Sequence, residues 1–72
     1  MSDLEARLLA AHAHGDNAAM VELYQEAAST APDPAEQAFF LTQAHVFAME
    51  IAHPDAAALR QTLVRMGRET PL

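Results

Sequence analysis

Three short corners divide this chain of 72 residues into four segments. Gly15 followed by Asp16 is typical of a helix end and then of a helix N-cap. Asp33 is suited to cap a helix that has Pro34 at its first position. Pro54 marks a further helix start. Because the connections are so short, neighbouring helices are expected to run antiparallel.

The segments between these corners favour helix over strand. Alanine is the commonest residue, glycine occurs only twice, and no segment alternates apolar and polar residues. The expected helices span about residues 2–14, 16–31, 34–52 and 54–67. The sequence therefore predicts an all-α fold, a single domain over residues 1–72, with four short antiparallel helices as two helical hairpins or a small bundle.

Composition limits what can stabilise the fold and what the protein can bind. The chain has no cysteine, so disulfides and thiolate zinc sites are excluded and a reducing compartment is expected. A net charge of −6 with no lysine argues against nucleic acid and favours a basic protein segment as partner. The start of the chain lacks the features of a secretory signal, and no stretch has the ~20 apolar residues of a membrane span. We expect a cytoplasmic protein that does not bind membranes.

Two of the expected helices have the single apolar face of a helix at the outside of a core. In the helix at 16–31 the apolar face holds Met20, Leu23, Tyr24, Ala27 and Ala31, and the opposite face holds Glu22, Gln25, Glu26 and Ser29. In the helix at 54–67 the apolar face holds Leu59, Leu63 and Met66, and the opposite face holds Arg60, Arg65 and Arg68.

The helix at 34–52 differs, because its only polar line is Glu36, Gln43 and Glu50. Three short neighbours can hardly enclose a helix that is apolar nearly all round. Leaving one large apolar side chain in water forfeits about 1.5–3 kcal/mol. We therefore predict a homodimer that uses this helix, while a monomeric structural domain with a tightly packed core is the alternative. His45 is expected to be a core or interface histidine.

Two histidine patterns raise the question of a metal. His12 and His14 are two residues apart and point about 200° away from each other on a helix, so we interpret them as part of a corner. Glu50 and His53 have the Glu-x-x-His spacing of carboxylate-bridged metal bundles. A metal-binding helical protein that uses this pair is therefore an alternative function. Its further carboxylates would be Glu22 and Glu26, although both are expected to face solvent.

Catalytic motifs are not evident. None of the hydroxyl residues lies in a Gly-x-Ser-x-Gly turn, and two glycines cannot form a phosphate-binding loop. We expect a protein that is not an enzyme and that needs no cofactor.

Residues 15–32 resemble the second half of a tetratricopeptide repeat. The Gly-Asp corner, Tyr24 as the aromatic, Ala27 as the small residue and Pro32 as the closing proline carry the resemblance. Residues 34–67 could form a second helical pair, with a longer first helix and a His-Pro-Asp corner. Two repeats are fewer than a stacked array usually needs, which again favours a dimer.

The resemblance implies protein binding through the inner face of each first helix. That face would carry Glu5, Leu9, His12, Phe39, Gln43, Val46 and Phe47. Capture of a C-terminal carboxylate is not expected, because the family uses lysines for it and this chain has none. The sequence thus predicts a small, non-catalytic protein–protein interaction module that binds itself and, beyond that, another protein or a basic peptide segment.

Overall fold

The computed structural model of the chain describes residues 3–67, and it confirms the all-α fold. The four helices are α1 (Asp3–His14), α2 (Asn17–Thr30), α3 (Pro34–Glu50) and α4 (Ala56–Arg65). No strand occurs in this described range. Residue 2, where the first helix was expected to begin, and Arg68 lie outside it.

The corner between α1 and α2 has the expected geometry. Gly15 adopts φ +62°, and the amide N–H of Asp16 donates to the carbonyl of Ala11 over 3.0 Å, which closes the end of α1. The Asp16 carboxylate accepts the amide N–H of Ala19 at 3.1 Å and caps α2. Because Asp16 is the cap, α2 begins one residue later than predicted.

The corner between α2 and α3 also follows the sequence. The Asp33 carboxylate accepts the amide N–H of Ala35 at 2.7 Å, and Pro34 is the first residue of α3. The side-chain amide of Gln37 donates to the carbonyl of Ala31 at 3.0 Å and ties the loop to the helix.

α3 ends at Glu50, two residues before the expected end at about residue 52. Ala52 adopts the left-handed φ of +51°, which no helix can continue through. The amide N–H of His53 then donates to the carbonyl of Ala48 at 2.8 Å, and that of Ala52 to the carbonyl of Met49 at 3.3 Å. This pattern is the Schellman motif, with alanine in the position that glycine usually holds.

α4 begins at Ala56, two residues after the expected start at about residue 54. Asp55 is the cap residue, but its side chain makes no capping hydrogen bond. Its carboxylate instead accepts the side-chain amide of Gln25 at 3.1 Å, which links the start of α4 to α2. α4 ends at Arg65, two residues before the expected end at about residue 67, and Gly67 follows at φ +74°.

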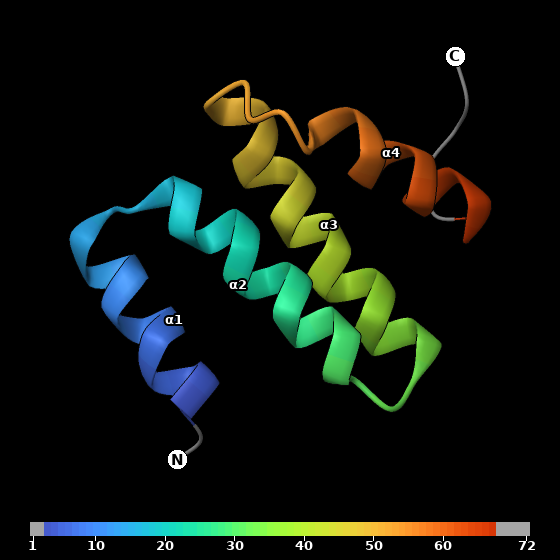
Figure 1. Cartoon of the computed structure of the whole chain (residues 1–72). Helices are drawn as coiled ribbons and strands as arrows, with labels where there is room; N and C mark the ends of the chain where they lie inside the picture. The colour runs from blue at the N-terminus through green and yellow to red at the C-terminus, as the bar shows by residue number, and fades with distance from the viewer. Residues whose placement is uncertain (1–2, 68–72) are drawn as a thin grey trace.

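Helices that are neighbours in the sequence are also neighbours in space (Figure 1). α2 lies between α1 and α3, and α4 packs against α3 and runs back toward its N-terminal end. The prediction that α2 lies at the outside of the core is therefore wrong, although its predicted apolar face is buried or half-buried and Glu22, Glu26 and Ser29 are exposed as expected. Val21, which is 0% exposed, and Ala28 are buried in addition to the predicted face, and Gln25 is half-buried.

The core consists of two small clusters that meet at α2. One holds Val21, Ala44, Ala48 and Leu59, and the other holds Ala11, Met20 and Leu23. α3 contributes only alanines to the first cluster, so its backbone approaches α2 and α4 closely. The larger side chains of α3 are consequently partly buried or exposed, which places most of its apolar surface outside the core.

Candidate interaction surface

One face of α3 exposes three large apolar side chains to solvent. Phe39 is 57% exposed, Val46 41% and Met49 57%. Thr42, which is half-buried, lies between Phe39 and Val46 on the same face, and Ala35, which is exposed, lies one turn before Phe39. We call these five residues the α3 stripe.

The α3 stripe has the spacing of a helix–helix seam. Its members follow one another at steps of four, three, four and three residues, which is the a/d pattern of a coiled coil. The one hydroxyl in the α3 stripe is already satisfied, because Thr42 Oγ1 donates to the carbonyl of Ala38 at 2.8 Å. A second helix could therefore cover the whole α3 stripe without burying an unpaired donor.

The two sides of the α3 stripe differ in charge and in cover. On one side lies the acidic ridge, formed by Glu36, Gln43 and Glu50, the polar line seen in the sequence; both glutamates are exposed. On the other side Ala38 and His45 are buried, and His45 is only 5% exposed. His45 is therefore already a core histidine within a single copy of the chain.

An aromatic cluster joins α1, α2 and α3 next to the acidic ridge. The Tyr24 ring stacks on Phe47 at a centroid distance of 5.9 Å and on Phe40 at 6.2 Å. His12 meets Phe47 edge-on at 6.2 Å, and its Nε2 lies 3.1 Å from the Tyr24 hydroxyl. These contacts fix the position of α1 relative to α3, whose backbones are separated by α2.

The structure divides the residues predicted from the sequence into three groups. Phe39 and Val46 lie on the α3 stripe and Gln43 on the acidic ridge. His12 and Phe47 are in contact within the aromatic cluster. Glu5 and Leu9 are exposed on α1, with Leu9 58% exposed.

Sequence reasoning missed several members of these surfaces. Met49 belongs to the α3 stripe, and its spacing of three residues from Val46 was a signal that could have found it. Tyr24 and Phe40 belong to the aromatic cluster. No sequence signal points to that pair, because the contact depends on how α2 and α3 cross.

The residues of the metal-binding alternative are not gathered into a site. His53 lies beyond the end of α3, so it does not share a helical face with Glu50. Its Nδ1 accepts the amide N–H of Asp55 at 3.0 Å. Glu26 accepts a hydrogen bond from Arg7 at 2.8 Å. Among residues 3–67, no group of three or more histidine, aspartate or glutamate side chains could hold a metal ion.

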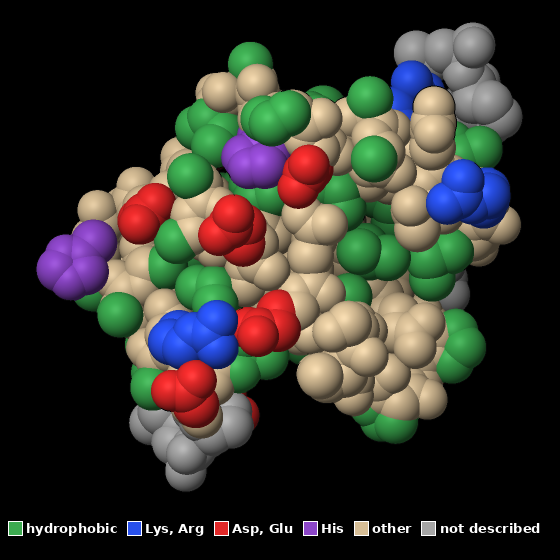
Figure 2. All heavy atoms as spheres, in the orientation of Figure 1, with side chains coloured by type: hydrophobic (Ala, Val, Ile, Leu, Met, Phe, Trp, Pro, Cys, Tyr) green, Lys and Arg blue, Asp and Glu red, His purple; other side chains and the backbone are tan. Residues whose placement is uncertain are grey.

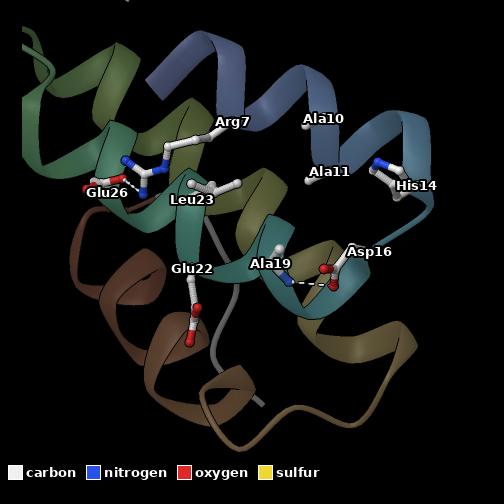
Figure 3. A pocket seen from close by; sticks show the side chains of 9 residues that line it. All are labelled: Arg7, Ala10, Ala11, His14, Asp16, Ala19, Glu22, Leu23 and Glu26. Atoms are coloured by element: carbon white, nitrogen blue, oxygen red, sulfur yellow. Dashed lines mark hydrogen bonds and ion pairs between the residues drawn. The ribbon is translucent and has the colours of Figure 1, made fainter. Parts of the chain in front are cut away.

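An open cleft of about 590 Å³ lies between α1 and α2 (Figure 3). Ala10, Ala11, Ala19 and Leu23 form much of its wall. Arg7 reaches across one end of it to Glu26, while Glu22 points away from α1. Hydrogen bonds to Asp3 and then to Glu26 raise the pKa of the Arg7 guanidinium above its ordinary value. The arginine is therefore committed to these carboxylates, and Asp16, which also lines the cleft, is engaged as the cap of α2.

Charge is distributed unevenly over the surface (Figure 2). In this view acidic side chains gather over α1 and α2 with a cationic side chain among them, and further cationic side chains lie along α4. α4 carries Arg60 and Arg65 and no acidic residue. Arg65 is exposed, and its guanidinium makes one hydrogen bond, to Thr62 Oγ1 at 3.2 Å.

No family model matches the chain, and neither the curated proteins nor the solved structures contain a significant match. No helix within residues 3–67 is both long enough and apolar enough to cross a membrane.

Proposed function

We propose that this protein is a small non-catalytic interaction module that forms a homodimer through the α3 stripe. The observation that carries the proposal is the exposure of Phe39, Val46 and Met49 on one helix face. Burying a large apolar side chain stabilises a complex by about 1.5–3 kcal/mol at most. A two-fold dimer buries each of these residues in both copies, because the two copies use the same surface.

The resemblance to tetratricopeptide repeats supports the same class of function. Such repeats are protein-binding modules. Two repeats are too few to form a stable stack by themselves, so a partner would complete the stack. The absence of cysteine is compatible with the reducing cytoplasm, where we place the protein. A basic segment of another protein is a second possible occupant, because the acidic ridge borders the apolar α3 stripe.

We do not extend the proposal to metal binding. Glu50 is exposed, while the Nδ1 atom of His53 is engaged by a backbone amide and Glu26 by Arg7. None of these positions favours the metal-binding alternative over self-association.

The test is the oligomeric state of two matched variants, measured by size-exclusion chromatography with light scattering. Phe39→Glu places a charge on the α3 stripe and should convert the dimer to a monomer. Leu9→Glu changes a residue of equal exposure on α1 and should leave the dimer intact. Circular dichroism confirms that both variants fold. If Phe39→Glu remains dimeric, the α3 stripe is not the interface; if the unmodified protein is monomeric but binds a basic peptide, the second occupant is correct.

A further inference from the structure

We propose that the two copies of α3 lie parallel in the dimer, so that the acidic ridge of each protomer faces α4 of the other. This inference rests on the proposed self-association through the α3 stripe. It adds the orientation of the second copy and the ion pairs that select it. Four observations support it: the order of residues around α3, the placement of α4, the charge of the acidic ridge and the charge of α4.

The order of side chains around α3 places its two flanks beside different helices. At 100° per residue, the acidic ridge is followed by Phe40 and Phe47, which stack on Tyr24 of α2. Ala44 and Ala48 come next and pack against Val21 of α2 and Leu59 of α4. His45 and Ala38 follow, on the side of α3 away from α2. The acidic ridge therefore borders the α2 side of α3, and the opposite flank borders α4.

An antiparallel dimer would place like charges together. Each helix of a two-stranded pair has two flanks beside the seam. In an antiparallel pair each flank faces the same flank of the other helix, whereas in a parallel pair it faces the opposite flank. An antiparallel pair would thus set Glu36 of one copy near Glu50 of the other, and the symmetry would repeat this contact. Because α3 contains no lysine or arginine, nothing on the helix would offset the repulsion.

A parallel dimer would place opposite charges together. The flank that faces the acidic ridge is then the one bordered by α4, which carries Arg60 and Arg65 and no acid. α4 turns back toward the N-terminal half of α3 (Figure 1), so the end of α4, where Arg65 is the last residue, lies nearer the start of α3 than the beginning of α4 does. Arg65 is exposed and uses one of its five N–H donors on Thr62, which leaves donors for a carboxylate of the second copy.

Disulfide trapping tests the orientation directly, because the chain has no cysteine of its own. Ala35→Cys and Met49→Cys place single thiols near the two ends of the α3 stripe, about 20 Å apart along the helix. In a parallel dimer each variant should form a disulfide with its own copy under mild oxidation. A disulfide that forms only in a mixture of the two variants would show an antiparallel dimer. That result would overturn this inference and leave the proposed self-association standing.

Charge reversal gives a second test, because the orientation of the two helices decides whether the dimer dissociation constant rises or falls. In the parallel dimer, Glu36→Arg should raise the dimer dissociation constant by about four- to twenty-five-fold, because the two-fold axis repeats a pair that contributes about two- to fivefold. The double variant Glu36→Arg, Arg65→Glu should restore it. Glu22→Arg, an exposed acid on α2, is the matched control and should have little effect. If Glu36→Arg leaves the dissociation constant unchanged or lowers it, the inference is wrong. If neither the unmodified protein nor any of the variants forms a dimer, the proposed function itself fails.

Discussion

Replacing Leu63 by alanine should destabilise the fold far more than replacing Leu9 by alanine. Leu63 is 0% exposed on α4, whereas Leu9 is 58% exposed on α1. A buried Leu→Ala change costs about 2–5 kcal/mol, because it combines lost burial with a cavity. For the fully enclosed Leu63 we expect about 3–4 kcal/mol. Leu9 keeps roughly two fifths of its surface covered and leaves no cavity, so we expect less than about 1 kcal/mol.

These losses should be easy to separate in a domain of this size. A chain of this length is typically stable by about 4–11 kcal/mol, so Leu63→Ala removes a large share of the free energy of unfolding. The midpoint of thermal unfolding should fall by about 12–30 °C for Leu63→Ala. Urea unfolding followed by circular dichroism at low protein concentration gives both free energies. Equal losses for the two variants would refute the placement of Leu63 in the core and of Leu9 at the surface.

Three smaller changes test the corners and the attachment of α4. Ala52→Gly should raise the free energy of unfolding by about 0.5–1 kcal/mol, because glycine relieves the left-handed strain at φ +51°; a loss in urea unfolding would contradict this. Asp33→Ala should cost about 1 kcal/mol through loss of the α3 cap, and a thermal midpoint equal to that of the unmodified protein would show that the cap contributes nothing. Gln25→Ala should cost about 1 kcal/mol and increase amide exchange at the start of α4, because it removes the hydrogen bond to Asp55; unchanged exchange there would speak against the link.

The helices and two of their corners were predictable because their signals are local. Gly15 and Asp16 end one helix and cap the next, and Asp33 with Pro34 begins α3, as the residue types indicate. The end of α3 was not predictable, because Ala52 takes a left-handed conformation that alanine rarely adopts. There the sequence pattern continues as a helix while the backbone turns.

The role of α2 was mispredicted because alanine is compatible with both a buried and an exposed face. Ala28 and Val21 extend the buried surface around the helix, so that α2 packs against two neighbours and not one. The arrangement of the helices in space decides which faces are covered, and residue types alone do not specify it.

The surplus of apolar surface on α3 was expected, but its direction was not. Small residues, Ala44 and Ala48, face the core, while Phe39 and Met49 face solvent. Hydrophobicity alone would place the larger side chains inside. Ala44 and Ala48 occupy the centre of the contact of α3 with α2 and α4, Phe47 and Leu41 pack beside them, and the α3 stripe lies on the remaining face.

The central claim is that the α3 stripe is covered by a second copy of the chain. Sedimentation equilibrium of the unmodified protein, from micromolar to millimolar concentration, tests it most directly. For a dimer, the mass should rise to twice the 7.8 kDa of the chain and no further. A mass of one chain at every concentration would contradict it.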